Sequence, residues 1–413
     1  MKRLFLFLLI TMSLCRYVPM SLFAFTYPDS TRGIPDFVLS GYQRGLGDAV
    51  SSVGARSVAM GSTGITSSDE PSTIFINPAG LSTIDSKMFS FGFSVIPVSE
   101  RIDTTSKDAP FYNSQMYYSL DNIALAYPFS ESFQAGLGFF PLYDFQYKHK
   151  KYYYSGGKTT GVKNISATGT IYTLTPAISF KWRSAALGVA YNSWLGKGET
   201  EIKDTTYATS TTAQVSTKTV LTSEIPGSNI ALGSVVHIGQ NVRLGLAYKT
   251  SFKADNKYKT MGSTITVTGK AEYSYPSEIG FGLGYFFGSS GENKILIDFL
   301  MKNWADFRVS GKKLTGFRNF NELHIGAEHK ITQDVLLRYG FYYQPYYAAR
   351  EFEKVFFTAG VGVNLSTVLS VDIAGEYGKR DYRFIDEQER FWDDDQRVDE
   401  SIKKILLQGK LKW

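Results

Sequence analysis

Seven ionisable residues downstream of residue 240 lie on the polar side of segments in which apolar and polar residues alternate: Arg243, Asp298, His324, Glu328, Arg338, Asp372 and Glu376. Because successive side chains of a β-strand point to opposite faces, we expect these charges to share one face, although a β-bulge would invert the assignment locally. Two chemistries fit such a set. The charges can form ion pairs inside the protein, or an arginine can bind a ligand carboxylate. Arg243, Arg338 and His324 are therefore candidate ligand contacts, with internal ion pairs as the alternative.

The same residue types do not assemble an enzyme site. The chain has four histidines: His149, His237, His324 and His329. No two of them have metal-ligand spacing with a third partner, and neither a Gly-x-Ser-x-Gly elbow nor a phosphate-binding loop occurs. The run from Asp393 to Asp395 lacks the spaced ligands and glycine of a calcium loop, which favours an acidic surface loop. We expect no catalytic residue, no metal and no cofactor, and a protein that is not an enzyme.

Composition narrows the class of protein. Aromatic residues make up 15% of the 413 residues, which is expected where Tyr and Trp line two membrane interfaces. The mean hydropathy of −0.14 would suit a soluble protein, but a β-barrel hides its membrane signal because lipid-facing residues alternate with polar ones. The net charge is +6, yet no basic run is interleaved with exposed aromatics, so we expect no nucleic-acid partner. The dense basic cluster from Lys148 to Lys151 predicts a solvated loop beside an aromatic girdle.

The N-terminus predicts export. Lys2 and Arg3 precede an apolar stretch from Leu4 to Leu14 that is too short to span a bilayer comfortably. We predict a signal peptide over 1–24. Cys15 would leave with it, so the mature chain would have no cysteine and no disulfide.

Downstream of residue 86 the period of two predicts strands. In the segment 242–248, Val242, Leu244 and Leu246 share one face, while Arg243 and Gly245 share the other. About fourteen such segments occur, an even number as bacterial single-chain barrels require. They span 87–97, 116–127, 133–147, 168–182, 185–198, 228–238, 241–252, 276–287, 293–304, 322–331, 334–346, 355–365, 368–378 and 402–413. We predict an all-β protein whose residues 87–413 form an antiparallel transmembrane β-barrel.

The connections alternate in length. Short turns are predicted at 129–132, 183–184, 239–240, 288–292, 332–333 and 366–367. Long, solvated loops are predicted at 98–115, 148–167, 199–227, 253–275, 305–321, 347–354 and 379–401. Periplasmic turns of outer-membrane barrels are short and their extracellular loops are long. This sorting of lengths predicts the bacterial outer membrane.

The last predicted strand carries a second export signal. Its apolar face holds Ile405, Leu407, Leu411 and the terminal Trp413, and its polar face mainly holds Lys404, Gln408, Lys410 and Lys412. An apolar alternation that ends in a terminal aromatic resembles the targeting signal of bacterial outer-membrane proteins. The resemblance implies recognition by the barrel assembly machinery. The alternative is an edge strand of a soluble sheet.

Residues 26–86 do not alternate and instead carry two motifs. The stretch from Gly54 to Gly61 and the run Asn77, Pro78, Ala79 and Gly80 resemble the FadL-type family of long-chain fatty acid and hydrophobic-compound transporters, including its PorV-like relatives. The segments 275–285, 321–328 and 338–342 resemble later strands of that family. The resemblance implies that residues 25–86 form a hatch that plugs the barrel, with Asn77 to Gly80 inside it. Alternatively, Asn77 and Pro78 merely shape a turn.

The resemblance implies a monomeric channel in outer-membrane lipid for passive uptake of hydrophobic small molecules, such as long-chain fatty acids or hydrocarbons. It also implies an alternative, a PorV-like protein that binds or assembles secreted proteins at the cell surface. A third, weaker hypothesis is an adhesin or a purely structural barrel. Cells lacking a channel would take up the ligand more slowly, whereas secretion components would co-purify with an assembly protein.

Overall fold

The computed structural model describes residues 47–67, 69–104, 111–155, 158–209, 212–261, 266–288, 291–314, 317–347, 353–384 and 396–413. The predicted signal peptide, residues 25–46 and the acidic run 393–395 lie outside the described residues. Among the residues described, no helix is long and apolar enough to cross a membrane.

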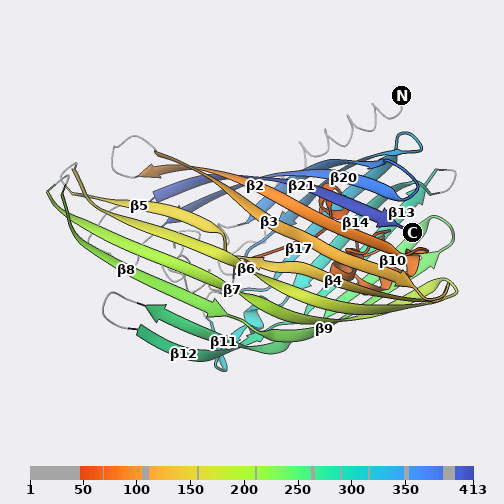
Figure 1. Cartoon of the computed structure of the whole chain (residues 1–413), viewed down its shortest axis with the longest axis horizontal. Helices are drawn as coiled ribbons and strands as arrows, with labels where there is room; N and C mark the ends of the chain where they lie inside the picture. Colours follow the sequence, from red (N-terminus) through yellow and green to blue (C-terminus); the bar gives the residue numbers. More distant parts are fainter. Residues whose placement is uncertain are drawn as a thin grey trace. The chain divides into compact units, whose positions relative to one another are not determined.

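Fourteen antiparallel strands form a closed barrel in the described part of the chain (Figure 1). They are β2 (Met88–Thr104), β3 (Phe111–Pro128), β4 (Phe133–Asp144), β6 (Lys158–Trp182), β7 (Ala185–Thr209), β9 (Gly227–Ile238), β10 (Val242–Lys249), β13 (Glu278–Phe287), β14 (Asn293–Lys302), β17 (Phe320–Lys330), β18 (Val335–Gln344), β19 (Lys354–Asn364), β20 (Leu369–Phe384) and β21 (Gln396–Lys412). The first of them, β2, pairs with the last, β21, and this pairing closes the ring. The predicted all-β fold and strand number are confirmed.

The alternation of side chains sorts the wall into two faces. On β10, Leu244 and Leu246 are 44% and 39% exposed on the outside. Gly245, between them, lies against Ile65 on the inside. Apolar side chains are exposed on strand after strand and form a continuous outer surface. A surface of this kind is unfavourable in water and favourable in lipid. The short turns fall where the sequence predicts them, for example between Trp182 and Ala185.

The long connections differ from the prediction. Instead of solvated loops, several are strands: β5 (Tyr147–Ser155), β8 (Thr212–Glu224), β11 (Phe252–Met261) and β12 (Thr266–Tyr275), with the short β15 (Arg308–Val309), β16 (Lys312–Lys313) and η4 (Trp304–Asp306). Together with the long ends of β6 and β7, the strands β5, β8, β11 and β12 project from one end of the barrel (Figure 1). These segments are rich in Thr, Val and Tyr, which favour pleated strands even where both faces are polar. The strands therefore continue past the apolar residues that revealed them in the sequence.

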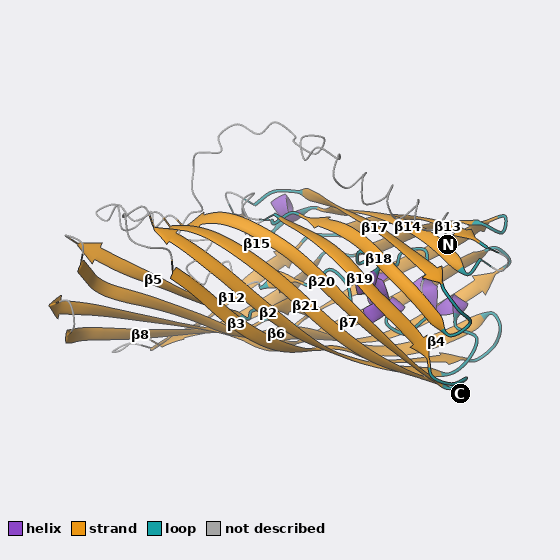
Figure 2. Ribbon diagram, turned by 90° about the horizontal axis from the view of Figure 1, so that it is seen from above, coloured by secondary structure: helices purple, strands orange, loops and turns teal. Residues whose placement is uncertain are grey.

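The N-terminal segment, residues 47–85, packs inside the ring of strands. It contains β1 (Asp48–Ala49), α3 (Ala55–Ala59), α4 (Thr73–Ile76) and η3 (Pro78–Thr83). Helix α3 contacts β18 to β21, while η3 contacts β4, β6, β7 and β9 on another part of the ring. Figure 2 shows these helices within the barrel. Because one short segment touches both groups of strands, it crosses the lumen and buries its apolar residues against the wall.

Candidate functional site

Glycines of the wall let the backbone of the N-terminal segment approach closely. A Cβ added to Gly340 would lie 2.3 Å from the backbone nitrogen of Gly61, and one added to Gly326 would lie 2.1 Å from the carbonyl oxygen of Met60. Both values are far shorter than a van der Waals contact. The predicted interior glycines of β13 behave in the same way, because a Cβ on Gly282 would lie 2.7 Å from Cβ of Ile65. The wall is therefore shaped to receive this segment.

Asn77 fixes the segment to itself and to the wall. Its side chain is fully buried, and its Oδ1 accepts a hydrogen bond of 3.0 Å from the backbone nitrogen of Ala79. Its Nδ2 donates to the carbonyl oxygens of Ile65 at 2.7 Å and of Ser234, on β9, at 3.2 Å. Pro78 begins η3, where a missing backbone donor costs nothing. Asn77 thus caps the turn and also joins the segment to a strand of the barrel.

Ion pairs join the segment to the opposite wall. Arg56 of α3 donates to Glu328 through Nε at 2.9 Å and Nη2 at 2.8 Å. Arg338 donates to the same carboxylate at 2.7 Å and to Asp372 at 2.5 Å. All four side chains are buried. The guanidinium of Arg338 therefore already has two carboxylate partners, an arrangement that favours the internal ion-pair alternative for this residue.

The other predicted contacts are placed differently. Nδ1 of His324 lies 2.9 Å from the carbonyl oxygen of Gly61, so this nitrogen must carry the proton in that hydrogen bond. Asp298 accepts from the backbone nitrogens of Gly64 and Ile65 at 2.7 and 3.0 Å. The Arg243 guanidinium lies 3.8 Å from the centre of the Phe286 ring. His324 and Asp298 therefore bind the segment from the wall, whereas Arg243 stacks on an aromatic ring.

Asp69 adds a pH-sensitive contact to this attachment. Its carboxylate lies 2.7 Å from Nη1 of Arg56 and 3.4 Å from Nζ of Lys294, and its side chain is 48% exposed. Burial acts to raise the pKa of Asp69, but the charges of Arg56 and Lys294 outweigh it and hold that pKa well below its ordinary value. The exposure lets solvent screen the pair, so its contribution to stability is modest.

We expect the stabilisation by Asp69 to depend on pH in one direction. The folded carboxyl group keeps its charge to lower pH than the unfolded one, whose pKa is about 3.9. The stabilisation is therefore full above pH about 4 and is lost as the pH falls further. Melting temperatures of the wild type and Asp69→Asn in detergent should differ above that pH and converge below it. A difference that does not vary with pH would mean that Asp69 acts by packing alone.

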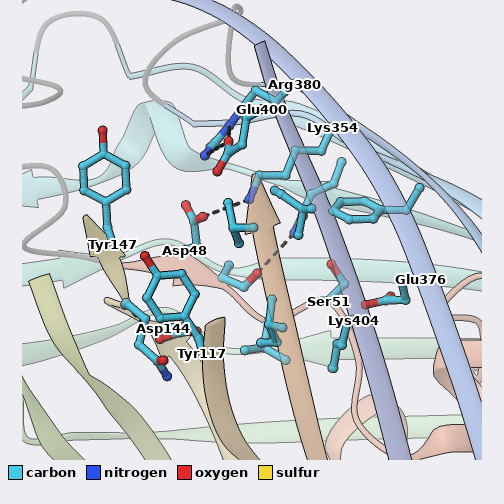
Figure 3. A pocket seen from close by; sticks show the side chains of 18 of the residues that line it. Asp48, Ser51, Tyr117, Asp144, Tyr147, Lys354, Glu376, Arg380, Glu400 and Lys404 are labelled. Atoms are coloured by element: carbon cyan, nitrogen blue, oxygen red, sulfur yellow. Dashed lines mark hydrogen bonds and ion pairs between the residues drawn. The ribbon is translucent and has the colours of Figure 1, made fainter. Parts of the chain in front are cut away.

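A cavity of about 160 Å³ lies inside the barrel next to the segment. Ser51 and Ser62 of the segment line it together with residues of the wall (Figure 3). Lys354 points toward Asp48, at 2.9 Å between Nζ and Oδ2. Lys404 also lines the cavity and pairs with Asp121 at 3.1 Å. Sequence reasoning missed both lysines as functional candidates, although Lys404 is on the polar face of the last predicted strand; Lys354 ends a segment that was predicted to be a loop.

The barrel wall is interrupted beside this cavity. In the described chain, the ladder between β3 and β4 runs only from the pair Ile123–Phe139 to the pair Pro128–Gln134. Beyond it the end of β4 pairs with β1 of the N-terminal segment instead. Side chains bridge the interruption: Gln146 donates to the carbonyl oxygen of Tyr118 at 3.2 Å, and Asn113 donates to that of Lys148 at 3.1 Å. Residues from both sides of the interruption line the cavity.

The chain belongs to the family described as outer membrane protein transport protein (OMPP1/FadL/TodX), whose model matches residues 45–404. The protein is accordingly an outer-membrane β-barrel of bacteria. No curated protein sequence matches the chain.

Solved structures share the fold at low identity. A Pseudomonas aeruginosa FadL homologue is 13% identical, with a TM-score of 0.65, over 88% of this chain and 99% of that one. The P. putida toluene transporter TodX is also 13% identical, with a TM-score of 0.62 and the same shares. The Ralstonia pickettii toluene transporter TbuX is 15% identical, with a TM-score of 0.57 over 88% and 99%.

Proposed function

We propose that this chain is a passive channel through which hydrophobic small molecules cross the outer membrane, and that residues 25–86 act as its hatch. The observation that carries the proposal is the cavity inside the closed barrel, beside the interruption between β3 and β4. A hydrophobic molecule held there would leave sideways into the lipid through this interruption, past the bridging side chains of Gln146 and Asn113. It need not pass the segment anchored by Asn77. Residues 1–24 would be the signal peptide and 87–413 the monomeric barrel, inserted by the barrel assembly machinery.

A buried aromatic cluster at the projecting end suits the capture of such a molecule. Trp304 stacks on Tyr347 at 4.4 Å, and Phe252 stacks on Tyr275 at 4.9 Å, between ring centres. Trp304 and Tyr347 line a second, smaller cavity that shares Lys354 with the first. Aromatic surfaces bind apolar ligands without needing a hydrogen-bond partner. This continuity supports a route from the aromatic cluster to the inner cavity.

We infer the ligand class from the aromatic cluster and from Lys354. TodX and TbuX are described as toluene transporters, and CymD as a monoaromatic hydrocarbon channel. The aromatic cluster of this chain suits such neutral ligands. Lys354 would suit the carboxylate of a long-chain fatty acid, which would compete with the half-exposed Asp48. The channel we propose therefore accepts hydrophobic molecules with or without an acidic end, and it needs no energy source.

The test is mass spectrometry of lipids extracted from the purified, detergent-folded protein, with Asn77→Ala as the comparison. We expect a stoichiometric apolar ligand in the wild type. Removing the Asn77 amide leaves buried backbone groups without partners, which costs about 1–3 kcal/mol of attachment of the segment. We expect the variant to retain roughly tenfold less ligand. Asn241→Ala, which removes an amide from the short turn between β9 and β10, should leave ligand content unchanged.

Two results would argue against the channel. An empty barrel, together with unchanged uptake of fatty acids and aromatic hydrocarbons by cells that lack the protein, would refute it. Secretion components that co-purify in stoichiometric amount with an empty barrel would favour the PorV-like alternative instead.

A further inference from the structure

Six strands at the extracellular end form one projecting antiparallel sheet. In order they are β5, β6, β7, β8, β11 and β12, and each pairs with the next. One face of this sheet is turned inward, where Tyr147, Ile165 and Ala167 are buried. The other face is turned outward and carries the opposite set of alternating residues. Outer-membrane barrels carry their long connections on the extracellular side, so the base of this sheet lies next to the outer leaflet.

The outward face continues the lipid-facing belt without a break. Along β7, Leu187, Tyr191 and Leu195 are exposed apolar residues of the belt. The next outward residue is Lys197, and Lys203 follows six residues later on the same face. The change from apolar to charged side chains therefore takes place within two residues. A surface directly above the hydrocarbon belt lies at the depth of the lipid headgroups.

Lysines dominate this outward surface, which we name the lysine face. Its lysines are Lys148, Lys150, Lys197, Lys203, Lys218, Lys253, Lys257, Lys259 and Lys270, all of them exposed. Its acidic residues are Glu199, Glu201, Glu224, Asp255 and Glu272. Lysines outnumber acidic residues on this face, so it carries an excess of positive charge that begins where the apolar belt ends.

Two pairs of lysines on this face stand directly opposite each other. Lys203 pairs with Lys218 across β7 and β8, and Lys257 pairs with Lys270 across β11 and β12. Like charges in this position destabilise a sheet. Lys218 is compensated by Glu201 at 2.8 Å. Within the described residues no ion pair joins Lys203, Lys257 or Lys270 to a carboxylate. Glu224 of β8 stands opposite Lys257 on its other side, so Lys203 and Lys270 are the least compensated of the three.

We propose that the lysine face binds the phosphate groups of the anionic glycolipid in the outer leaflet. A phosphate between opposed lysines removes their repulsion and accepts hydrogen bonds from both ammonium groups. Each lysine near an anionic membrane surface adds about as much attraction as a fivefold gain in affinity. The proposal goes beyond the transport function and does not depend on the ligand that crosses the barrel. Binding of the lipid phosphates would fix the depth and orientation of the projecting sheet. It would thereby also fix the position of the aromatic cluster next to the sheet.

The test measures binding of purified lipopolysaccharide to the detergent-folded, full-length mature protein. The variant K203Q/K257Q/K270Q removes three charges of the lysine face that form no ion pair within the described residues. The control variant K87Q/K181Q/K330Q removes the same charge near the short-turn end. We expect the first variant to bind at least about tenfold more weakly and the control to bind like the wild type. Dephosphorylated lipopolysaccharide should bind the wild type weakly, as intact lipopolysaccharide binds the first variant. Added salt should weaken the complex of the wild type with intact lipopolysaccharide.

Several outcomes would overturn the proposal. Equal weakening in the two variants would show that only the net charge of the protein matters. Equal binding of the dephosphorylated lipid would show that the phosphate groups are not recognised. Competition by millimolar inorganic phosphate as strong as that by the lipid would assign the face to the free anion. Tight binding of polyglutamate together with no binding of lipopolysaccharide would assign it to an acidic protein. Heat-modifiable migration of each variant in gels confirms that the barrel is folded, and hydrocarbon uptake by the variant reports separately on the channel.

Discussion

Replacing Arg338 by methionine should lower the free energy of unfolding of the detergent-folded barrel by roughly 3–5 kcal/mol. The guanidinium is buried between Glu328 and Asp372, at 2.7 and 2.5 Å. Its removal takes one positive charge away from two buried carboxylates. Glu328 keeps Arg56 and Lys294 beside it, and Asp372 keeps Lys410, so their negative charge is only partly balanced. Removing one partner from a buried network of ion pairs is among the most destabilising single substitutions. Equilibrium unfolding in denaturant, followed by tryptophan fluorescence, measures the loss.

The matched control is Arg397→Met, which removes an arginine from an exposed ion pair with Asp381 on neighbouring strands. We expect no measurable change there, because solvent screens exposed pairs. If Arg338 instead serves mainly to hold a ligand carboxylate, Arg338→Met would keep its stability and lose affinity for fatty acids but not for toluene. That pattern would contradict the ion-pair assignment and restore the ligand hypothesis for this residue.

The sequence predicts the barrel because each strand carries its own evidence. In 242–248, the alternation of Val242, Leu244 and Leu246 with Arg243 and Gly245 is a local property, set by the geometry of one strand in lipid. The same parity assigns Asp298, His324, Glu328, Arg338 and Asp372 to the inner face, and all five side chains are buried in the structure. Strand number and inward charges could be predicted since neither needs a contact with a distant residue.

What could not be predicted depends on pairs of residues far apart in the chain. Asp48 and Lys354 are 306 positions apart, and only the path of the N-terminal segment brings them together. The projecting strands were hidden for another reason. Their two faces are both largely polar, for example at Lys203 and Asp204, so no apolar alternation marks them as strands. The long hairpins are held instead by their backbone ladders and by strand-forming Thr and Val residues.

The other large effect should come from Gly340→Ala, which we expect to displace the N-terminal segment from the wall. The added Cβ would lie 2.3 Å from the backbone nitrogen of Gly61 and 2.5 Å from the carbonyl carbon of Met60. These are backbone atoms, so no side chain can rotate away, and overpacking of this kind costs about 1–3 kcal/mol or more. Gly375→Ala is the matched control, since the nearest atom to its Cβ, the carbonyl oxygen of Ala359, is 3.9 Å away.

Trypsin reports the displacement at Arg56, which is buried against Glu328 in the seated segment. Cleavage after Arg56 in the folded barrel should be at least about tenfold faster in Gly340→Ala than in Gly375→Ala, which corresponds to about 1.4 kcal/mol of lost attachment. Single-channel conductance in planar bilayers should rise in the first variant alone, since the displaced segment no longer crosses the lumen. If the variant barrel is folded, as heat-modifiable migration shows, and cleavage is unchanged, then the strands of the wall shift to accept the added methyl group and the segment stays in place. In that case the segment is a fixed part of the barrel and not a hatch, and transport must then pass through the interruption between β3 and β4 without any movement of Asn77.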